Sequence, residues 1–172
     1  MSGPSSQPSF EAVVLPYLDA GYNLARWLVR DRGDAEDVVQ EALVRALTYF
    51  PSFRGTNPRG WFLQIVRNAA YASMSLSRGI PGAELPDEDA LADPADDPEA
   101  ALIRRRGRTD LARHIARLEV ELRETLILRE FEDLSYKEIA QITGAPIGTV
   151  MSRLWRARRM LALAIRREEQ DA

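Results

Sequence analysis

The chain contains no cysteine and a single histidine, His114. Without cysteine there can be no disulfide and no thiolate chemistry, which is compatible with a reducing cytoplasm. One imidazole with no thiol beside it offers no basis for a zinc site or a nucleophilic triad, and the sequence has no repeat and no glycine-rich phosphate loop. We therefore expect no catalytic residue, no metal site and no cofactor.

Long apolar runs and a secretion signal are also lacking. No stretch approaches the roughly 20 apolar residues that a membrane-spanning helix requires, so we expect no membrane insertion and a cytoplasmic location. Residues 1–9 are rich in glycine, proline, serine and glutamine and lack the basic start of a secretory leader. We expect them to form a disordered tail.

The acidic balance of the chain comes from one segment. The 172 residues have a formal net charge of −3, but eight acids and no base lie between Glu84 and Glu99, and the remainder carries 23 basic against 18 acidic side chains, a net of +5. The segment also contains three prolines, and such a composition cannot bury enough apolar surface to order itself. We predict a flexible acidic linker over residues 79–108.

On both sides of this linker, apolar residues recur at helical spacing. The sequence predicts an all-α fold of two small helical domains, residues 10–78 and 109–172, tethered by the linker rather than fused. In the first domain, Asp34 is expected to cap a helix, with Glu36 and Asp37 in its first turn. The 45% hydrophobic content is enough to form a core in each domain.

Residues 134–161 have the pattern of a helix-turn-helix. Ser135 and Glu138 have the spacing of a capping box, and Gly144 is placed to end the first helix. On a helical wheel, the second helix has a packing side and a polar side. The predicted packing residues are Val150, Leu154, Ala157, Leu161 and Ile165; the predicted DNA-facing residues are Thr149, Ser152, Arg153, Arg156 and Arg159. From residue 149 to 167 there are six arginines and no acid, which favours DNA over a merely solvated basic face.

Residues 51–83 combine four arginines and no acid with aromatic side chains, among them Trp61, Phe62 and Tyr71. Basic groups beside aromatics can hold unstacked single-stranded bases. Alternatively, Trp61 and Phe62 are ordinary core residues and the arginines are solvated. Composition alone leaves both interpretations open.

Together these segments resemble a sigma factor of bacterial RNA polymerase, of the small extracytoplasmic-function (ECF) group of the sigma-70 family. In the first domain the resemblance is carried by Asp34–Glu41, Phe53–Gly55, Asn57–Phe62 and Arg67-Asn68, and in the second by Leu134–Ala140, Gly148–Leu154 and Ala157-Arg158. It covers nearly the whole chain outside the tail and the linker.

The resemblance implies a promoter-specific initiation factor that is not an enzyme. It would bind core RNA polymerase, recognise the −10 and −35 promoter elements, assist DNA melting, and have an anti-sigma factor as a further partner. By resemblance, the core polymerase-binding residues are Asp34, Asp37, Gln40 and Glu41. The −10 element and melting residues are Arg54, Thr56, Asn57, Arg59, Trp61, Gln64, Arg67 and Asn68, and the −35 residues are Thr149, Ser152, Arg153, Arg156 and Arg159.

The chain departs from the family pattern at two informative places. The basic run expected after Asn68 is reduced to Arg78, and the usual Leu-Pro step before the helix-turn-helix is Leu118-Glu119, so the helices there could be continuous or differently bent. The sparse basic run motivates an alternative, a sigma-like decoy that titrates an anti-sigma factor. A repressor acting without polymerase is a third possibility, against which the 34–41 signature and the two-domain layout argue.

Overall fold

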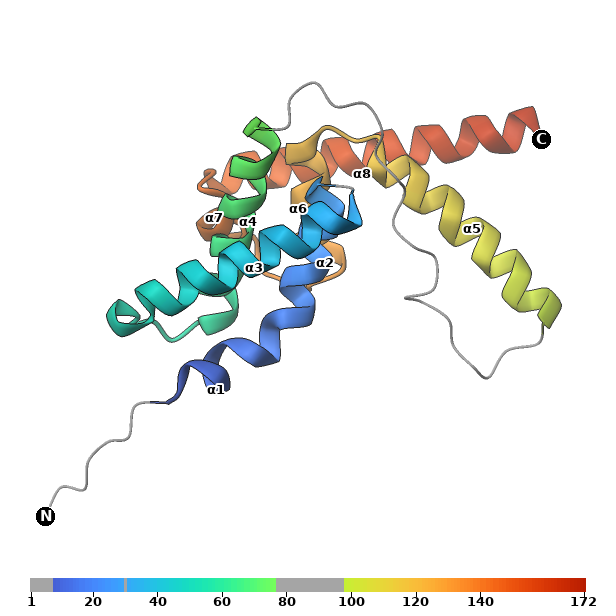
Figure 1. Ribbon diagram of the computed structural model, residues 1–172. Coiled ribbons are helices and arrows are strands. Elements are labelled where there is room, and N and C mark those ends of the chain that lie inside the picture. Colours follow the sequence, from blue (N-terminus) through green and yellow to red (C-terminus); the bar gives the residue numbers. More distant parts are fainter. Residues whose placement is uncertain (1–7, 30, 77–97) are drawn as a thin grey trace, which may run out of the picture.

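The computed structural model describes residues 8–29, 31–76 and 98–172, and in these ranges it contains helices and connecting turns but no strand (Figure 1). The first lobe comprises α1 (Phe10–Val14), α2 (Leu18–Val29), α3 (Arg32–Tyr49) and α4 (Pro58–Leu76), with 3-10 turns at Leu15–Tyr17 and Phe50–Ser52. The second lobe comprises α5 (Pro98–Ala116), α6 (Val120–Glu130), α7 (Tyr136–Thr143) and α8 (Ile147–Asp171). The predicted all-α class is confirmed.

The expected tail and most of the expected linker lie outside the described residues. Residues 98–108, assigned to the linker from composition, belong instead to α5. A break separates α5 from α6, with Glu119 at the N-cap of α6, so the helices before the helix-turn-helix are not continuous. None of the described helices combines the length and the apolar content needed to cross a membrane.

In the first lobe, α2, α3 and α4 pack against one another around fully buried side chains that include Leu24 and Phe62. The approach of α2 to α4 is close at Gly21, where a Cβ atom would lie 2.8 Å from Cε1 of Phe62. Phe62 is therefore a core residue, in agreement with the second interpretation of Trp61 and Phe62 given above, in which they are ordinary core residues.

The cap of α3 differs from the one predicted. Asp31, not Asp34, is the N-cap residue, and its Oδ1 accepts a hydrogen bond from the Asp34 backbone N–H at 3.0 Å. Asp34 is in the first turn, where its charge still favours the positive end of the helix dipole. The prediction was wrong by three residues. Asp31 and Asp34 lie in the same turn-forming stretch, and aspartate suits a cap at either position.

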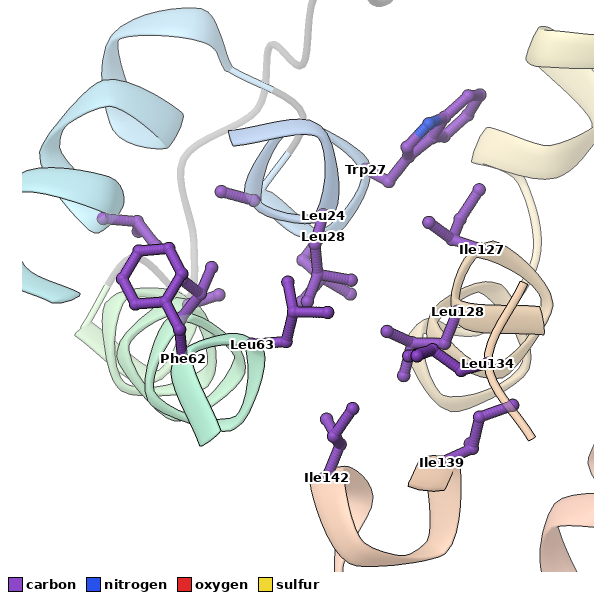
Figure 2. Close-up of a cluster of buried hydrophobic side chains, with 14 of the residues drawn as sticks. Leu24, Trp27, Leu28, Phe62, Leu63, Ile127, Leu128, Leu134, Ile139 and Ile142 are labelled. Atoms are coloured by element: carbon purple, nitrogen blue, oxygen red, sulfur yellow. The ribbon is translucent and has the colours of Figure 1, made fainter. Parts of the chain in front are cut away.

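The two lobes are fused through a single hydrophobic core, contrary to the expectation of two tethered domains. α2 packs against α6, and α4 packs against α7. Figure 2 shows the junction: Leu28 and Leu63 of the first lobe face Leu128 and Ile142 of the second. All four side chains are at most 2% exposed. Composition of the connecting segment predicted a tether, but apolar surface on both lobes is buried by their contact.

Candidate polymerase and nucleic-acid interfaces

The helix-turn-helix is built by local capping, as predicted. The Ser135 side chain accepts from the Glu138 N–H at 3.1 Å, and the Glu138 carboxylate accepts from the Ser135 N–H at 2.9 Å, which completes the capping box of α7. Gly144 ends α7 with a φ of 72°, a left-handed conformation that glycine adopts without strain. These two devices fix the direction in which α8 leaves the turn.

α8 separates a packing side from a basic side. Val150, Leu154 and Ala157 are buried, as predicted, whereas Leu161 is half-buried and Ile165 is 38% exposed. The packing prediction was wrong for Ile165 because α8 extends beyond the body of the second lobe at its C-terminal end (Figure 1). Of the predicted −35 residues, Ser152, Arg156 and Arg159 are exposed and Thr149 and Arg153 are half-exposed.

The predicted polymerase-binding residues lie along the outer side of α3. Asp34, Asp37, Gln40 and Glu41 are all exposed, while Ala35, Val38 and Val39 of the same helix are buried. Glu41 also accepts a hydrogen bond from Arg45 Nε at 2.9 Å, one turn further along the helix. The exposure of all four side chains leaves this polar side accessible to a partner.

The predicted −10 residues differ in exposure and in their contacts. Arg54, Thr56, Gln64 and Asn68 are exposed, and Arg54 Nη1 also donates to the backbone carbonyls of Pro51 at 2.7 Å and Phe53 at 3.0 Å. Asn57 has a structural role, because its Oδ1 accepts the Gly60 backbone N–H at 3.0 Å at the start of α4. Trp61 is half-buried, with its ring centroid 4.7 Å from that of Phe53. Arg59 and Arg67 are occupied by acids of the second lobe.

Arg67 belongs to a three-residue polar cluster between the lobes. Its Nε donates to Oε1 of Glu124 at 2.6 Å, and Tyr71 Oη donates to Oε2 of the same carboxylate at 2.7 Å. Glu124 is fully buried, and the Arg67 guanidinium lies 3.9 Å from the centroid of the Tyr71 ring. Burial would lower the pKa of Arg67, but the hydrogen bond and charge of Glu124 raise it above its usual value. Burial, and then Glu124, raise the pKa of Tyr71, so the phenol keeps its proton.

Arg59 makes the second polar contact between the lobes. Its Nη2 donates to Oε2 of Glu132 at 3.0 Å and to the Glu132 backbone carbonyl. Asn23 Nδ2 of α2 donates to the other carboxylate oxygen of Glu132 at 3.1 Å. Both oxygens of Glu132, like both oxygens of Glu124, are therefore taken by donors of the first lobe.

Arg123 is an interlobe residue that the sequence analysis missed. It is 4% exposed and donates to the carbonyls of Trp27 and Leu28, at 2.6 and 3.3 Å, and of Ala116 and Leu118, at 3.2 and 2.7 Å. These carbonyls lie at the ends of α2 and α5, where helices leave acceptors without intrahelical partners. The sequence contains no clear signal for this role, because α6 also carries Glu121, Arg129 and Glu130, and no local pattern distinguishes Arg123 from them.

Five of the eight predicted −10 residues line a hollow of about 570 Å³ that both lobes form: Arg54, Thr56, Asn57, Trp61 and Gln64. The first lobe contributes the loop from Ser52 to Asn57 together with Trp61 and Gln64. The opposite wall is formed by Glu138, Gln141 and Ile142 of α7. The lining includes the rings of Phe53 and Trp61, the side chain of Ile142 and the amides of Asn57, Gln64 and Gln141. Aromatic and apolar groups together with a few amides suit a planar heteroaromatic ligand.

No metal centre is formed by the part of the chain described: within residues 8–29, 31–76 and 98–172, no three histidine, cysteine or carboxylate side chains converge. The single histidine, His114, is buried, with Nε2 3.0 Å from Oε2 of Glu168 in α8. His114 and Glu168 are thus in contact across α5 and α8.

Comparison with known proteins identifies related sequences over both lobes. The model for sigma-70 region 2 matches residues 13–75, and the model for sigma-70 region 4 matches residues 108–161. The chain is 34% identical over 170 residues to the RNA polymerase sigma-H factor of Pseudomonas aeruginosa, covering 91% of this chain and 86% of that protein. It is 33% identical over 165 residues to the ECF RNA polymerase sigma-E factor of Escherichia coli K12, covering 88% and 84%.

A solved structure shares the arrangement of both lobes. The sigma factor RpoE from Bartonella quintana, in complex with the anti-sigma factor NepR, superposes with a TM-score of 0.73 at 27% identity. The match covers 91% of this chain and 96% of that one.

Proposed function

Because this chain belongs to the ECF group of the sigma-70 family, we propose that it confers promoter specificity on a bacterial core RNA polymerase. It acts in the cytoplasm, recognises a −10 and a −35 element, assists melting, and performs no catalytic step itself. The single observation that carries this proposal is the presence, in one chain and in family order, of the region 2 and region 4 segments with an exposed arginine side on α8.

The proposed polymerase contact is the outer side of α3. Asp34, Asp37, Gln40 and Glu41 form an exposed polar strip on a helix whose other side is anchored in the core. Exposed apolar residues extend the same helix, since Val44, Leu47 and Tyr49 are each about 60% exposed. A polar strip continued by exposed apolar residues is a composition suited to binding a protein surface.

The proposed −10 contact is the loop before α4 and the outer side of that helix. A base flipped from the non-template strand enters the hollow lined by Trp61 and Gln64, where an aromatic ring can stack on it. The exposed Arg54 and Asn68 lie on the same loop and helix, and they supply a cation and an amide for the backbone and the base edges.

The proposed −35 contact is the basic side of α8 in the major groove. Arg153, Arg156 and Arg159 supply guanidinium groups suited to guanine edges and phosphates, while Thr149 and Ser152 lie at the N-terminal end of the helix. The arginines remain accessible on the second lobe, which favours a DNA-binding factor over the decoy. An anti-sigma factor is a proposed partner, because the structural relative from Bartonella quintana is bound to one.

Replacing Trp61 by alanine tests the −10 assignment. We expect open-complex formation by the reconstituted holoenzyme to fall roughly 5- to 160-fold, because stacking of one base on an aromatic side chain contributes about 1–3 kcal/mol. Permanganate reactivity of unpaired thymines on a promoter measures this directly. Binding of the −35 duplex should be unchanged.

The matched control is Leu76→Ala, at the 90% exposed end of the same helix, which should melt the promoter like the wild type. Melting at the wild-type level by the Trp61→Ala protein would show that Trp61 does not hold a promoter base.

A further inference from the structure

Four aromatic rings in contact, those of Phe10, Phe50, Phe53 and Trp61, form an aromatic row from the first helix of the chain to the hollow in which the proposed function places a promoter base. We propose that Phe10 and Phe50, at the far end of this row, are positioning residues for the −10 contact. They act through Phe53 on the loop before α4 and on Trp61. The inference rests on the proposed function for the identity of the ligand.

The rings of the aromatic row are spaced for direct contact. The centroids of Phe10 and Phe50 are 5.6 Å apart, with their planes at 82°, which is an edge-to-face pair. Phe50 and Phe53 are stacked at 6.5 Å with 19° between their planes, and the centroids of Phe53 and Trp61 are 4.7 Å apart. Aromatic pairs attract each other at separations of about 4.5–7 Å, so each ring constrains the position of the next.

The two ends of the aromatic row are held by the helices that carry them. The Ser9 side chain caps α1 by accepting the Ala12 N–H at 3.2 Å, which places Phe10 at the start of that helix. Figure 1 shows α1 beside the turn that joins α3 to α4, and α1 packs against α4. At the other end, the Trp61 N–H donates to the Asn57 carbonyl at 3.1 Å as α4 begins. The aromatic row therefore connects two helices that are far apart in the sequence.

The middle of the aromatic row is a tight turn. The Phe53 N–H donates to the Phe50 carbonyl at 2.9 Å and closes the 3-10 turn Phe50–Ser52. Phe53 itself is extended, with a φ of −67° and a ψ of 122°, so the loop before α4 begins at this residue. A shift of the Phe50 ring therefore moves the point from which the loop departs.

The loop lies directly on the third ring of the row. A Cβ atom at Gly55 would lie 3.0 Å from Cε2 of Phe53, so the backbone of the loop is in close contact with that ring. Arg54 and Thr56, two exposed side chains assigned to the −10 element, are the neighbours of Gly55 in the chain. Both line the hollow together with Trp61. The position of the Phe53 ring thus sets where these side chains stand relative to a base in the hollow.

The four rings are all half-buried and pack against the core. A residue that only attaches α1 to the first lobe would need apolar volume and no particular shape. Transmission of position from ring to ring requires planar groups in contact, because the preferred geometries of these pairs depend on the ring edges and faces. Replacement by leucine separates the two roles, since leucine keeps apolar volume and removes the ring.

Base selectivity in promoter melting tests the role of Phe10. Permanganate reactivity compares a promoter that the wild-type holoenzyme melts with versions of it that carry single substitutions in the −10 element. For Phe10→Leu we expect the ratio of melting on the original promoter to melting on the substituted ones to fall roughly 2- to 12-fold, the range that corresponds to one aromatic pair. Because all promoters are measured with the same protein, any loss of folded or polymerase-bound chain cancels in this ratio. Phe50→Leu should lower the ratio in the same way.

Two variants control for packing. Phe10→Tyr keeps the ring and should retain the wild-type ratio. Tyr17→Leu removes another half-buried ring of the same N-terminal segment, one that is not part of the aromatic row, and it should leave the ratio unchanged. A wild-type ratio for Phe10→Leu, or an equal fall for Tyr17→Leu, would overturn the proposal.

A double-variant cycle tests the path through Phe53. The substitution Phe53→Leu interrupts the aromatic row, so adding Phe10→Leu should change the ratio by less than about twofold in that background, as expected for coupled residues. If the effects of the two substitutions multiplied instead, Phe10 would act independently of Phe53 and the proposed path would be wrong.

These outcomes are distinct from a failure of the proposed function. If the wild-type holoenzyme shows a −10 preference that Phe10→Leu leaves intact, the positioning role alone is wrong. If the wild-type chain directs no transcription, or melts promoters without any −10 preference, the proposed function is wrong and the positioning role fails with it.

Discussion

Replacing Arg153 and Arg156 together by alanine is expected to lower transcription from promoters that require the −35 element by roughly 100-fold. Both side chains lie on the basic side of α8, next to the side that buries Val150, Leu154 and Ala157. A bidentate contact between arginine and guanine contributes about 1–3 kcal/mol, and a phosphate contact adds a salt-dependent part. Loss of two such contacts therefore has the largest functional effect expected of any pair in this lobe.

The effect should be confined to DNA recognition. Affinity for core polymerase, measured by fluorescence of the labelled chain, should be unchanged, because α3 is the proposed polymerase contact. Arg166→Ala with Arg167→Ala is the matched control: both arginines are exposed on the same helix, but they lie three turns further along it. Equal losses for the two double variants would mean that α8 contributes only general positive charge.

Replacing Arg123 by methionine is expected to lower the free energy of unfolding by about 3–5 kcal/mol. Methionine retains much of the volume but leaves the carbonyls at the ends of α2 and α5 without the guanidinium donors. The loss of a donor costs more free energy at a buried carbonyl than at an exposed one. Arg123 donates to carbonyls of both lobes, so both lose donors in this variant. The expected change is a large fraction of the stability of a typical small protein.

Urea unfolding followed by circular dichroism measures this change. The control is Arg117→Met, an exposed arginine at the adjacent turn, which should change stability by less than about 0.5 kcal/mol. A loss of similar size in both variants would show that Arg123 acts through general charge and not through its carbonyl partners.

Local features of this fold could be predicted from the sequence because they depend on neighbouring residues. The capping box of Ser135 and Glu138 and the left-handed Gly144 are each specified within a few positions. The buried side of α8 could be predicted as far as Ala157, where the helix is still packed against the lobe. At Ile165 the periodicity persists but the partner surface is missing.

The junction between the lobes could not be predicted, because its polar contacts join residues far apart in the sequence. Glu124 and Glu132 resemble ordinary surface acids, and Arg59 and Arg67 resemble solvated or DNA-binding bases. Only the tertiary arrangement pairs them. The composition of the segment between the lobes predicted two independent domains. The lobes nevertheless pack against each other, because α4, α6 and α7 bury apolar side chains at their contact.

The aromatic residues of α4 illustrate why composition alone left two interpretations open. Phe62 has no solvent exposure and lies against Gly21 in the core of the first lobe. Its neighbour Trp61 is half-buried and lines the hollow shared with α7. Adjacent residues on a helix point about 100° apart, so one can be a core residue while the other stays available for a ligand.

The central claim is that this chain supplies sequence preference to a separate enzyme. Its most direct test is transcription by purified core RNA polymerase on a library of genomic fragments, with and without the purified chain. The account predicts transcripts that appear only when the chain is added and whose start sites share two upstream sequence elements. Transcripts without a shared element, or no chain-dependent transcripts although polymerase and chain are both intact, would contradict it.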